Sequence, residues 1–216
     1  MNSSPLQHPV KRRGRPPKNA GRTVGETRAS LIRAGLEMLT EKGYSAAGLD
    51  EILRNAGVPK GSFYHYFRSK EDFGTALISA YADYFAARLE RWLLNTERPP
   101  LQRLAGFVAD AVQGMARYDF RRGCLIGNLG QEMGALPESF RQQLNAVFAD
   151  WQMRTERCLT EAQQRGDIAA EHDCRQLAEF FWIGWEGAVL RAKLEQTATP
   201  LTVFASGFFR MIENNK

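Results

Sequence analysis

Two short helical segments joined by a glycine turn, within residues 49–66, constrain this chain more than any other feature. Leucine and isoleucine recur at helical spacing over residues 49–53, and Gly57 then supplies the residue best suited to a left-handed helix end. Pro59 can open the next helix, because a first-turn residue needs no N–H. The second helix is short and polar, and such a helix fits a DNA major groove about 12 Å wide. The segment therefore predicts a DNA-binding helix-turn-helix.

The residues around this motif resemble the DNA-binding domain of TetR-family transcriptional regulators, from about Thr27 to Phe73. The matching segments are Gly43-Tyr44, Ala56-Gly57-Val58, Lys60-Gly61-Ser62-Phe63-Tyr64, Tyr66-Phe67 and Ser69-Lys70-Glu71. The resemblance implies that the second helix, here called the recognition helix, contacts DNA and that Lys70 meets a phosphate. The DNA-contacting residues expected from it are Tyr44, Lys60, Gly61, Ser62, Tyr64, His65, Tyr66 and Lys70.

Composition limits the class of protein. A chain of 216 residues, 44% of them hydrophobic, is long enough for one domain or two small ones. No apolar run approaches the roughly 20 residues that cross a membrane, and the basic N-terminus has no apolar signal region. We therefore expect a cytoplasmic protein with no membrane contact. The three cysteines, Cys124, Cys158 and Cys174, lack the spacing of metal ligands, and no disulfide, metal or cofactor is predicted.

Positive charge is concentrated in residues 1–22. This segment holds six basic residues and no acidic one, and since the chain carries +5, the remainder carries a net charge of −1. Its Pro, Gly and polar content favours a disordered basic arm. Arg13-Gly14-Arg15-Pro16 resembles the core of AT-hook peptides, so Arg13 and Arg15 are expected to follow a DNA minor groove. A merely solubilising tail is the alternative.

The rest of the chain predicts helices and no strand. Thr23 and Glu26 have capping-box spacing, and Ser69 with Asp72 gives a second cap signal. We expect an all-α fold, with a three-helix DNA-binding domain over residues 23–72 and a larger bundle over 73–216 for ligand binding and dimerisation. The remaining helices are expected at about 99–118, 123–133, 137–165, 173–196 and 200–213.

The last two predicted helices carry more apolar surface than one chain needs. The helix at 173–196 is apolar around most of its circumference, and the helix at 200–213 has a wide apolar face. In TetR-like proteins the corresponding helices pair two subunits, and Gly184, Gly187 and Ala188 would permit close approach. We expect a homodimer, which would place two recognition helices on successive turns of a palindromic site. A purely intrachain core is the alternative.

The glycine-punctuated segment 121–132 is the candidate effector site. Its Gly-Cys-Leu pattern resembles a TetR subgroup that includes NemR, which responds to electrophiles through a cysteine, and a related group that regulates acrylate utilisation. Cys124 near a helix N-terminus, beside Arg121 and Arg122, would have a stabilised thiolate. A small buried cysteine that only packs is the alternative. Cys158, within a long helix, is expected in the core.

Further ligand contacts are expected from aromatic and polar residues of the bundle, although aromatic residues at helical spacing also form plain cores. A ligand carboxylate would pair with one of Arg117, Arg121, Arg122 and Arg191, most of which are otherwise expected to be solvated. The candidates with Cys124 are Trp92, Tyr118, Arg121, Asn128, Trp151 and Trp185.

Together these features predict a homodimeric repressor that leaves a palindromic double-stranded DNA operator when a small-molecule effector binds. The effector is expected to be an electrophile or an unsaturated carboxylate such as acrylate; a reversible sensor of a non-reactive apolar ligand is the alternative. The helix that starts at Ser69 would change the spacing between recognition helices. An enzyme with a cysteine nucleophile is disfavoured, since no histidine is placed to act as its base. A nucleoid protein is disfavoured by the near-neutral body.

Overall fold

The computed structural model describes residues 23–213, so the basic arm with Arg13 and Arg15 lies outside the described residues. The described residues form helices joined by short connections, and the only β pairing among them is an isolated bridge between Ile168 and Glu213. The predicted all-α class is confirmed. The helices are α1 (Val24–Lys42), α2 (Leu49–Ala56), η1 (Lys60–His65), α3 (Lys70–Leu93), α4 (Pro100–Ala116), α5 (Leu125–Gln131), α6 (Glu138–Gln164), α7 (Cys174–Glu195) and α8 (Thr199–Ile212).

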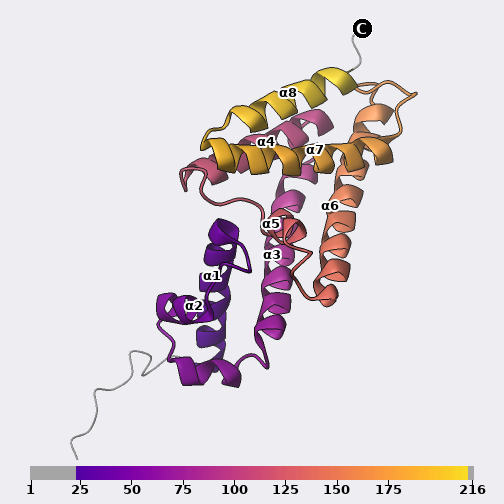
Figure 1. The fold of residues 1–216 in the computed structure, drawn as a ribbon. Coiled ribbons are helices and arrows are strands. Elements are labelled where there is room, and N and C mark those ends of the chain that lie inside the picture. Colours follow the sequence, from indigo (N-terminus) through magenta and orange to yellow (C-terminus); the bar gives the residue numbers. More distant parts are fainter. Residues whose placement is uncertain (1–22, 214–216) are drawn as a thin grey trace, which may run out of the picture.

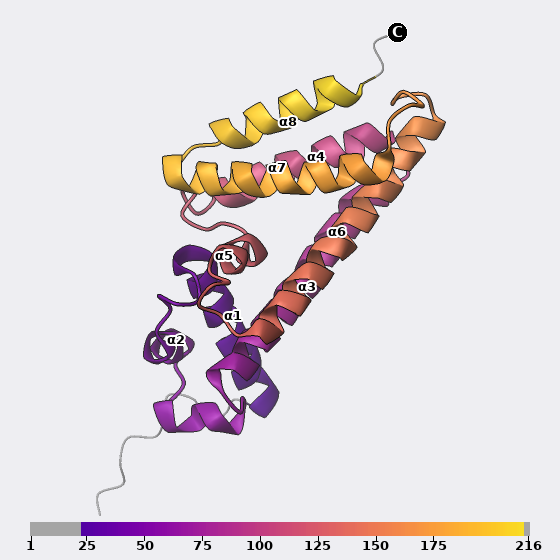
Figure 2. The ribbon, with the colours of Figure 1, turned by 45° about the vertical axis from the view of Figure 1, so that its right-hand side comes forward.

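The helices gather at two ends of an elongated molecule (Figure 1). α1, α2 and η1 form one end, whereas α4, α7 and α8 form the other. α3 runs from the first end to the second with α6 along its side, as Figure 2 also shows. The short helix α5 lies between the two ends and contacts α1, α3 and α6. Because α3 is continuous through residues 72 and 73, the predicted domain boundary falls inside one rigid element.

Side-chain caps and glycines set the helix ends where the sequence predicts them. The Thr23 hydroxyl accepts from the Glu26 N–H, and the Glu26 carboxylate accepts from the Thr23 N–H, which completes the capping box of α1. Ser69 caps α3 by accepting from the Asp72 N–H at 3.0 Å. Gly57 ends α2 in the left-handed region with φ 70°, a conformation that costs glycine little.

The recognition helix η1 is a 3-10 helix, whereas the sequence suggested a short α-helix. Its few residues follow Pro59 and include Gly61, and a segment this short gains too few hydrogen bonds to offset the cost of starting an α-helix. Phe63 holds it in place, because its fully buried ring lies 5.6 Å from the rings of both Phe67 and Phe73. Lys60, Tyr64 and His65 are thereby left exposed, and Ser62 is half-buried.

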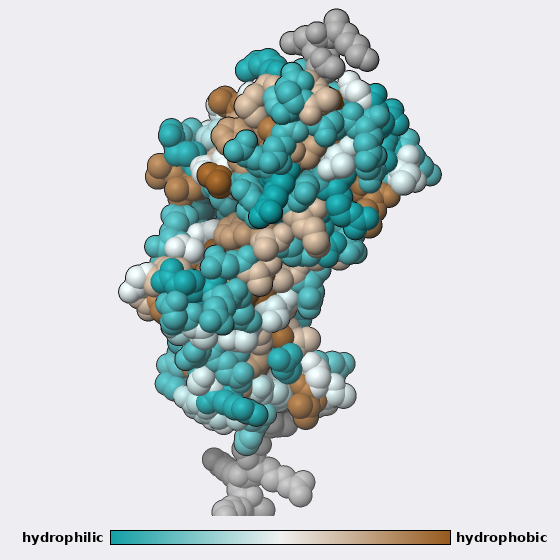
Figure 3. Space-filling view, turned by 90° about the vertical axis from the view of Figure 1, so that its right-hand side faces the viewer, coloured by the Kyte–Doolittle hydropathy of each residue, from teal (hydrophilic) through white to brown (hydrophobic). Residues whose placement is uncertain are grey.

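The core of the bundle is an aromatic cluster between α3, α4, α6 and α7. The ring centroids of Trp151 and Phe85 are 4.3 Å apart, and those of Trp151 and Trp182 are 4.9 Å apart. The buried Trp182 indole donates to the Thr155 hydroxyl at 3.0 Å, so this polar atom has a partner. The face of the molecule in Figure 3 is mostly hydrophilic, with separate small hydrophobic patches.

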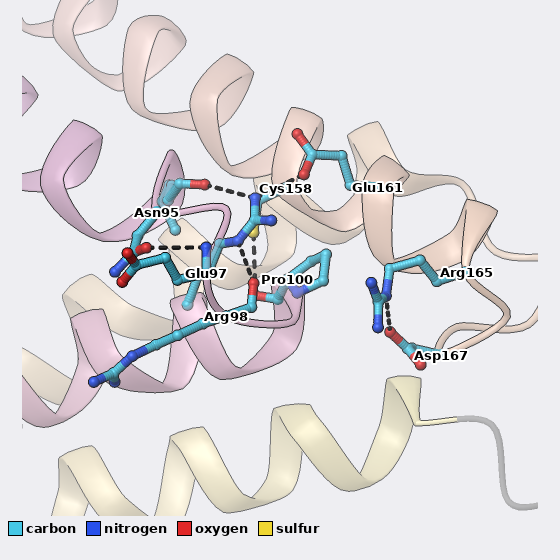
Figure 4. A network of polar contacts seen from close by, with 10 residues as sticks. Asn95, Glu97, Arg98, Pro100, Cys158, Glu161, Arg165 and Asp167 are labelled. Atoms are coloured by element: carbon cyan, nitrogen blue, oxygen red, sulfur yellow. Dashed lines mark hydrogen bonds and ion pairs between the residues drawn. The ribbon is translucent and has the colours of Figure 1, made fainter.

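A polar network fixes the start of α4 against α6 (Figure 4). Buried Arg103 donates to the Glu161 carboxylate at 2.7 Å and to the Arg98 carbonyl at 2.7 Å. The Cys158 thiol donates to the Pro100 carbonyl at 3.2 Å, and burial raises the pKa of this thiol to about 12. Cys158 is therefore a core residue, as the sequence predicted.

Candidate functional site

Four residues of the recognition helix are exposed at the end of the molecule opposite α8. Tyr64 has 70% of its surface exposed, and Lys60, Gly61 and His65 are also exposed. The Lys60 ammonium donates to the Asp50 carboxylate at 2.9 Å, an exposed ion pair that raises the pKa of Lys60 and that a phosphate can replace. The predicted contacts Ser62 and Tyr66 are half-buried beside them.

Tyr44, also expected to contact DNA, belongs to the core instead. Its side chain is 8% exposed, its ring packs edge-on against Phe140 at 5.4 Å, and its hydroxyl donates to the Lys70 carbonyl at 3.1 Å. Burial raises the pKa of Tyr44 to about 12. In this structure the side chain joins α3 and α6 to the end of α1, and the DNA contact expected from it stays a prediction.

Lys70 lies at the first position of α3, directly after the Ser69 cap. Its ammonium sits 4.5 Å from the centroid of the Tyr44 ring, and the residue remains exposed. A cation beside free N–H groups at a helix N-terminus is a favourable position for a phosphate.

A cavity of about 730 Å³ lies between α1 and the helices of the bundle. Ile32, Leu36 and Thr40 form its α1 side, and residues of α3, α4 and α7 form the opposite side. This volume falls within the range usual for small-molecule sites. Of the predicted ligand residues, Tyr118, Cys124 and Trp185 line the wall. Its charged residues are Arg33, Glu37, Arg88, Arg91, Asp110, Arg117, Arg122 and Glu186.

The environment of Cys124 differs from the one that the sequence predicted. Cys124 is the N-cap residue of α5, but its thiol is buried and contacts the Glu186 carboxyl. Burial and the negative charge of Glu186 raise the pKa of the thiol well above its ordinary value. Arg121 is exposed, and Arg122 lies 4.1 Å from the centroid of the Tyr118 ring. The expected thiolate stabilised by Arg121 and Arg122 is therefore wrong for this structure.

Glu186 is the residue of this site that the sequence analysis missed. It lies in the middle of α7, and burial raises the pKa of its carboxyl to about 7. Gly127 makes room for it, because a Cβ at Gly127 would clash with Oε2 of Glu186. A signal was present in the sequence, since Glu186 is the one acidic residue within the apolar stretch 180–190.

Four predicted ligand residues do not line this cavity. The Trp92 indole donates to Asp110 at 3.2 Å, Trp151 is fully buried in the aromatic core, and Arg121 faces solvent. Asn128 borders a separate void of about 10 Å³ next to Cys124. Its amide donates to the carbonyls of Leu39 and Thr40, at 3.1 and 3.0 Å. Asn128 thus joins α5 to the end of α1.

Several further hydrogen bonds hold the end of α1 to the bundle. The Lys193 ammonium of α7 donates to the Glu41 carbonyl at 2.7 Å, and the Gly123 N–H donates to the Thr40 carbonyl at 3.1 Å. The Glu132 carboxylate accepts from the N–H groups of Tyr44 and Ser45, at 2.9 and 2.7 Å. These contacts flank α5. A displacement of α5 would therefore change the hydrogen bonds that hold the end of α1.

The outer sides of α7 and α8 carry an apolar stripe that nothing in the described chain covers. Ile183, Leu190 and Leu194 are exposed on α7 at helical spacing, and Val203 and Met211 are exposed on α8. A Cβ added at Gly187 or Gly207, on the same faces, would meet no other atom. By contrast, Gly184 is needed within the chain, because Phe204 of α8 packs against it.

Within residues 23–213, no helix is long and apolar enough to span a membrane, and no group of three or more His, Cys, Asp or Glu side chains could hold a metal ion.

Comparison with known protein families gives one match for the DNA-binding helices and one for the bundle. Residues 31–77 match the family described as "Bacterial regulatory proteins, tetR family", and residues 100–208 match "Tetracyclin repressor-like, C-terminal domain". The transcriptional regulator AcuR of Cereibacter sphaeroides is 56% identical over 211 residues, which span 97% of this chain and 95% of AcuR. The chain belongs to the TetR family of transcriptional regulators.

Other TetR-family proteins share both sequence and fold with it. The repressor DhaR of Mycobacterium sp. is 32% identical over 86% of this chain and 91% of its own length. A solved TetR regulatory protein from Rhodobacter sphaeroides superposes with a TM-score of 0.85 at 59% identity, covering 86% of this chain and 98% of that one. Reduced Escherichia coli NemR superposes with a TM-score of 0.75 at 28% identity, covering 87% and 98%. The protein is accordingly a ligand-responsive TetR-type repressor and not an enzyme.

Proposed function

We propose that this TetR-family repressor acts in the cytoplasm as a homodimer and leaves a palindromic operator when a small unsaturated carboxylate or a related electrophile enters the cavity. The observation that carries the proposal is that one cavity touches both α1 and Cys124. A ligand there contacts α1 of the DNA-binding domain and the bundle at once.

The charge of the cavity wall supports an anionic effector. Five arginines and three acidic residues line it, and Asp110 is already paired with Arg88 at 2.7 Å. Arg33 and Arg117 are exposed at the wall, and Arg122 stacks on Tyr118 with only a long 3.9 Å contact to Glu37. A guanidinium in such a position can bind a carboxylate through two hydrogen bonds. The volume admits molecules several times larger than acrylate, so the proposal concerns a chemical class.

The dimer is supported by the apolar stripe on α7 and α8. Ile183, with 73% of its surface exposed, and Leu194, with 75%, would be buried by the same stripe of a second subunit. A two-fold axis there would set two recognition helices apart at a fixed distance, which suits two half-sites. The basic arm, with Arg13 and Arg15, is proposed to follow the adjacent minor groove.

Transmission from the cavity is proposed to use α5 as well as α3. Cys124 is the N-cap of α5. Asn128 of α5 donates hydrogen bonds to the carbonyls of Leu39 and Thr40, and the N–H of Gly123, just before α5, also donates to the Thr40 carbonyl. Ligand binding that moves α5 would release or redirect α1, and it favours the DNA-free state only if the ligand binds that state better.

A reversible sensor without cysteine chemistry is a second candidate, favoured by the burial of Cys124 and the raised pKa of its thiol. The two candidates are separated by gel-shift titration with acrylate and with propionate, its saturated analogue, on the wild type and Cys124→Ser. The covalent candidate predicts release of the wild type by acrylate alone and little release of the variant. The reversible one predicts that both compounds release both proteins. Retention of the operator with every carboxylate tested would refute the effector class.

A further inference from the structure

The thiol of Cys124 and the carboxyl of Glu186 form a pair in the wall of the cavity. Both residues line the cavity, and each contacts the other. The pair is built from separate elements, since Cys124 precedes α5 and Glu186 belongs to α7. Gly127 allows the carboxyl to lie against the first turn of α5, where any side chain at that position would clash with it.

Among residues 23–213, no Lys or Arg side chain forms an ion pair with this carboxyl. The basic groups on the neighbouring elements are engaged or turned away: Arg88 of α3 pairs with Asp110, Arg122 stacks on Tyr118, and Lys193 of α7 donates to α1 carbonyls. Arg117 at the end of α4 is exposed. Tyr81 of α3 is a further titratable group beside the pair, since its hydroxyl and the thiol affect each other's pKa.

The half-buried Glu186 carboxylate next to the thiol is a base for which the described part of the chain supplies no cation. Burial raises the pKa of Glu186 to about 7, so at neutral pH a large fraction of the carboxyl is ionised and still basic enough to take a proton. A buried thiol with a raised pKa is otherwise inert, because only the thiolate is a good nucleophile. Local proton transfer removes this obstacle without requiring free thiolate.

We propose that Glu186 accepts the Cys124 thiol proton when an α,β-unsaturated carbonyl compound occupies the cavity, and this inference rests on the proposed function. The sulfur forms a bond to the β-carbon, the C=C π bond breaks, and its electron pair moves to the α-carbon. The proton held by Glu186 is then returned to that carbon. Thiol and alkene become a thioether, with no oxidant, reductant or leaving group.

Two effects of Glu186 have opposite signs, and this makes the inference testable. If the carboxylate were only a negative neighbour, its removal would lower the thiol pKa and speed the reaction of Cys124. If it accepts the proton, its removal slows the reaction. Glu186→Gln keeps the size of the side chain but cannot accept a proton, so the direction of the change decides between the two.

The experiment measures the rate at which acrylamide, an uncharged α,β-unsaturated probe, alkylates Cys124, followed by peptide mass spectrometry from pH 5.5 to 9. In the wild type we expect the rate to rise with pH and to level off near pH 7. In Glu186→Gln we expect a rate at least about tenfold lower at pH 7, increasing up to the highest pH. Glu195→Gln, on the surface at the end of the same helix, should behave as the wild type.

Alkylation that is equally fast or faster in Glu186→Gln would overturn the inference. All variants should react alike in urea, where the pair no longer exists, and Glu186→Asp should recover part of the wild-type rate and its pH profile. Operator release is measured separately on the alkylated wild type. If alkylation depends on Glu186 but the operator stays bound, the proposed covalent mode of release fails while the role of Glu186 stands.

Discussion

Glu186 should make the folded protein less stable as the pH rises. Its carboxyl has a pKa of about 7 in the folded state, against an ordinary value of 4.5. Between these pH values the folded state keeps a proton that the unfolded state has lost, so the free energy of unfolding decreases with increasing pH. At about 1.4 kcal/mol per pH unit, the whole difference amounts to about 3 kcal/mol, fully lost above pH 7.

Glu186→Gln removes this titration. The variant and the wild type should have similar stability near pH 5, and the variant should be more stable by up to about 3 kcal/mol at pH 8. For a chain of this length the gain corresponds to a melting temperature roughly 6–12 °C higher. Urea unfolding followed by tryptophan fluorescence, at one protein concentration so that association does not vary, measures the difference at each pH.

A control variant isolates the effect of burial. Glu195 pairs with Arg191 at the end of the same helix, so Glu195→Gln should change stability by less than about 1 kcal/mol and by the same amount from pH 5 to pH 8. A constant difference between Glu186→Gln and the wild type over this pH range would refute the reasoning, because it would mean that Glu186 does not titrate there.

Four further outcomes are expected. Tyr64→Ala should weaken operator binding by at least about 1 kcal/mol in a gel shift without lowering the melting temperature, since the side chain is exposed. Deleting residues 1–20 should flatten the slope of log affinity against log salt by several units per dimer, at roughly 0.9 per lost phosphate contact; an unchanged slope would leave only a solubilising tail. Glu132→Gln should cost about 1–3 kcal/mol in urea unfolding, because one N–H at the end of α1 loses its acceptor. Ile183→Glu should yield monomers in analytical ultracentrifugation, and an unchanged dimer would place the interface elsewhere.

The local features of this protein were determined by the sequence alone. Two helix starts were predicted from cap signals, at Thr23 with Glu26 and at Ser69 with Asp72, and the structure confirms both. Gly57 likewise predicted the end of α2. These signals work because a cap acts within one helical turn, on N–H groups that the same few residues supply. The resemblance of residues 27–73 to the DNA-binding domain of TetR regulators was likewise confirmed by the comparisons.

Contacts between residues distant in the chain were decided only by the tertiary structure. The sequence placed Arg121 and Arg122 beside Cys124, yet in the folded chain the thiol faces Glu186, and Arg122 turns to Tyr118. Trp185 lines the cavity whereas Trp151 lies in the core, although both were equal candidates. A side chain's solvation and pKa depend on which other helix packs against it, and that partner is fixed by the packing of the whole bundle and not by the adjacent residues.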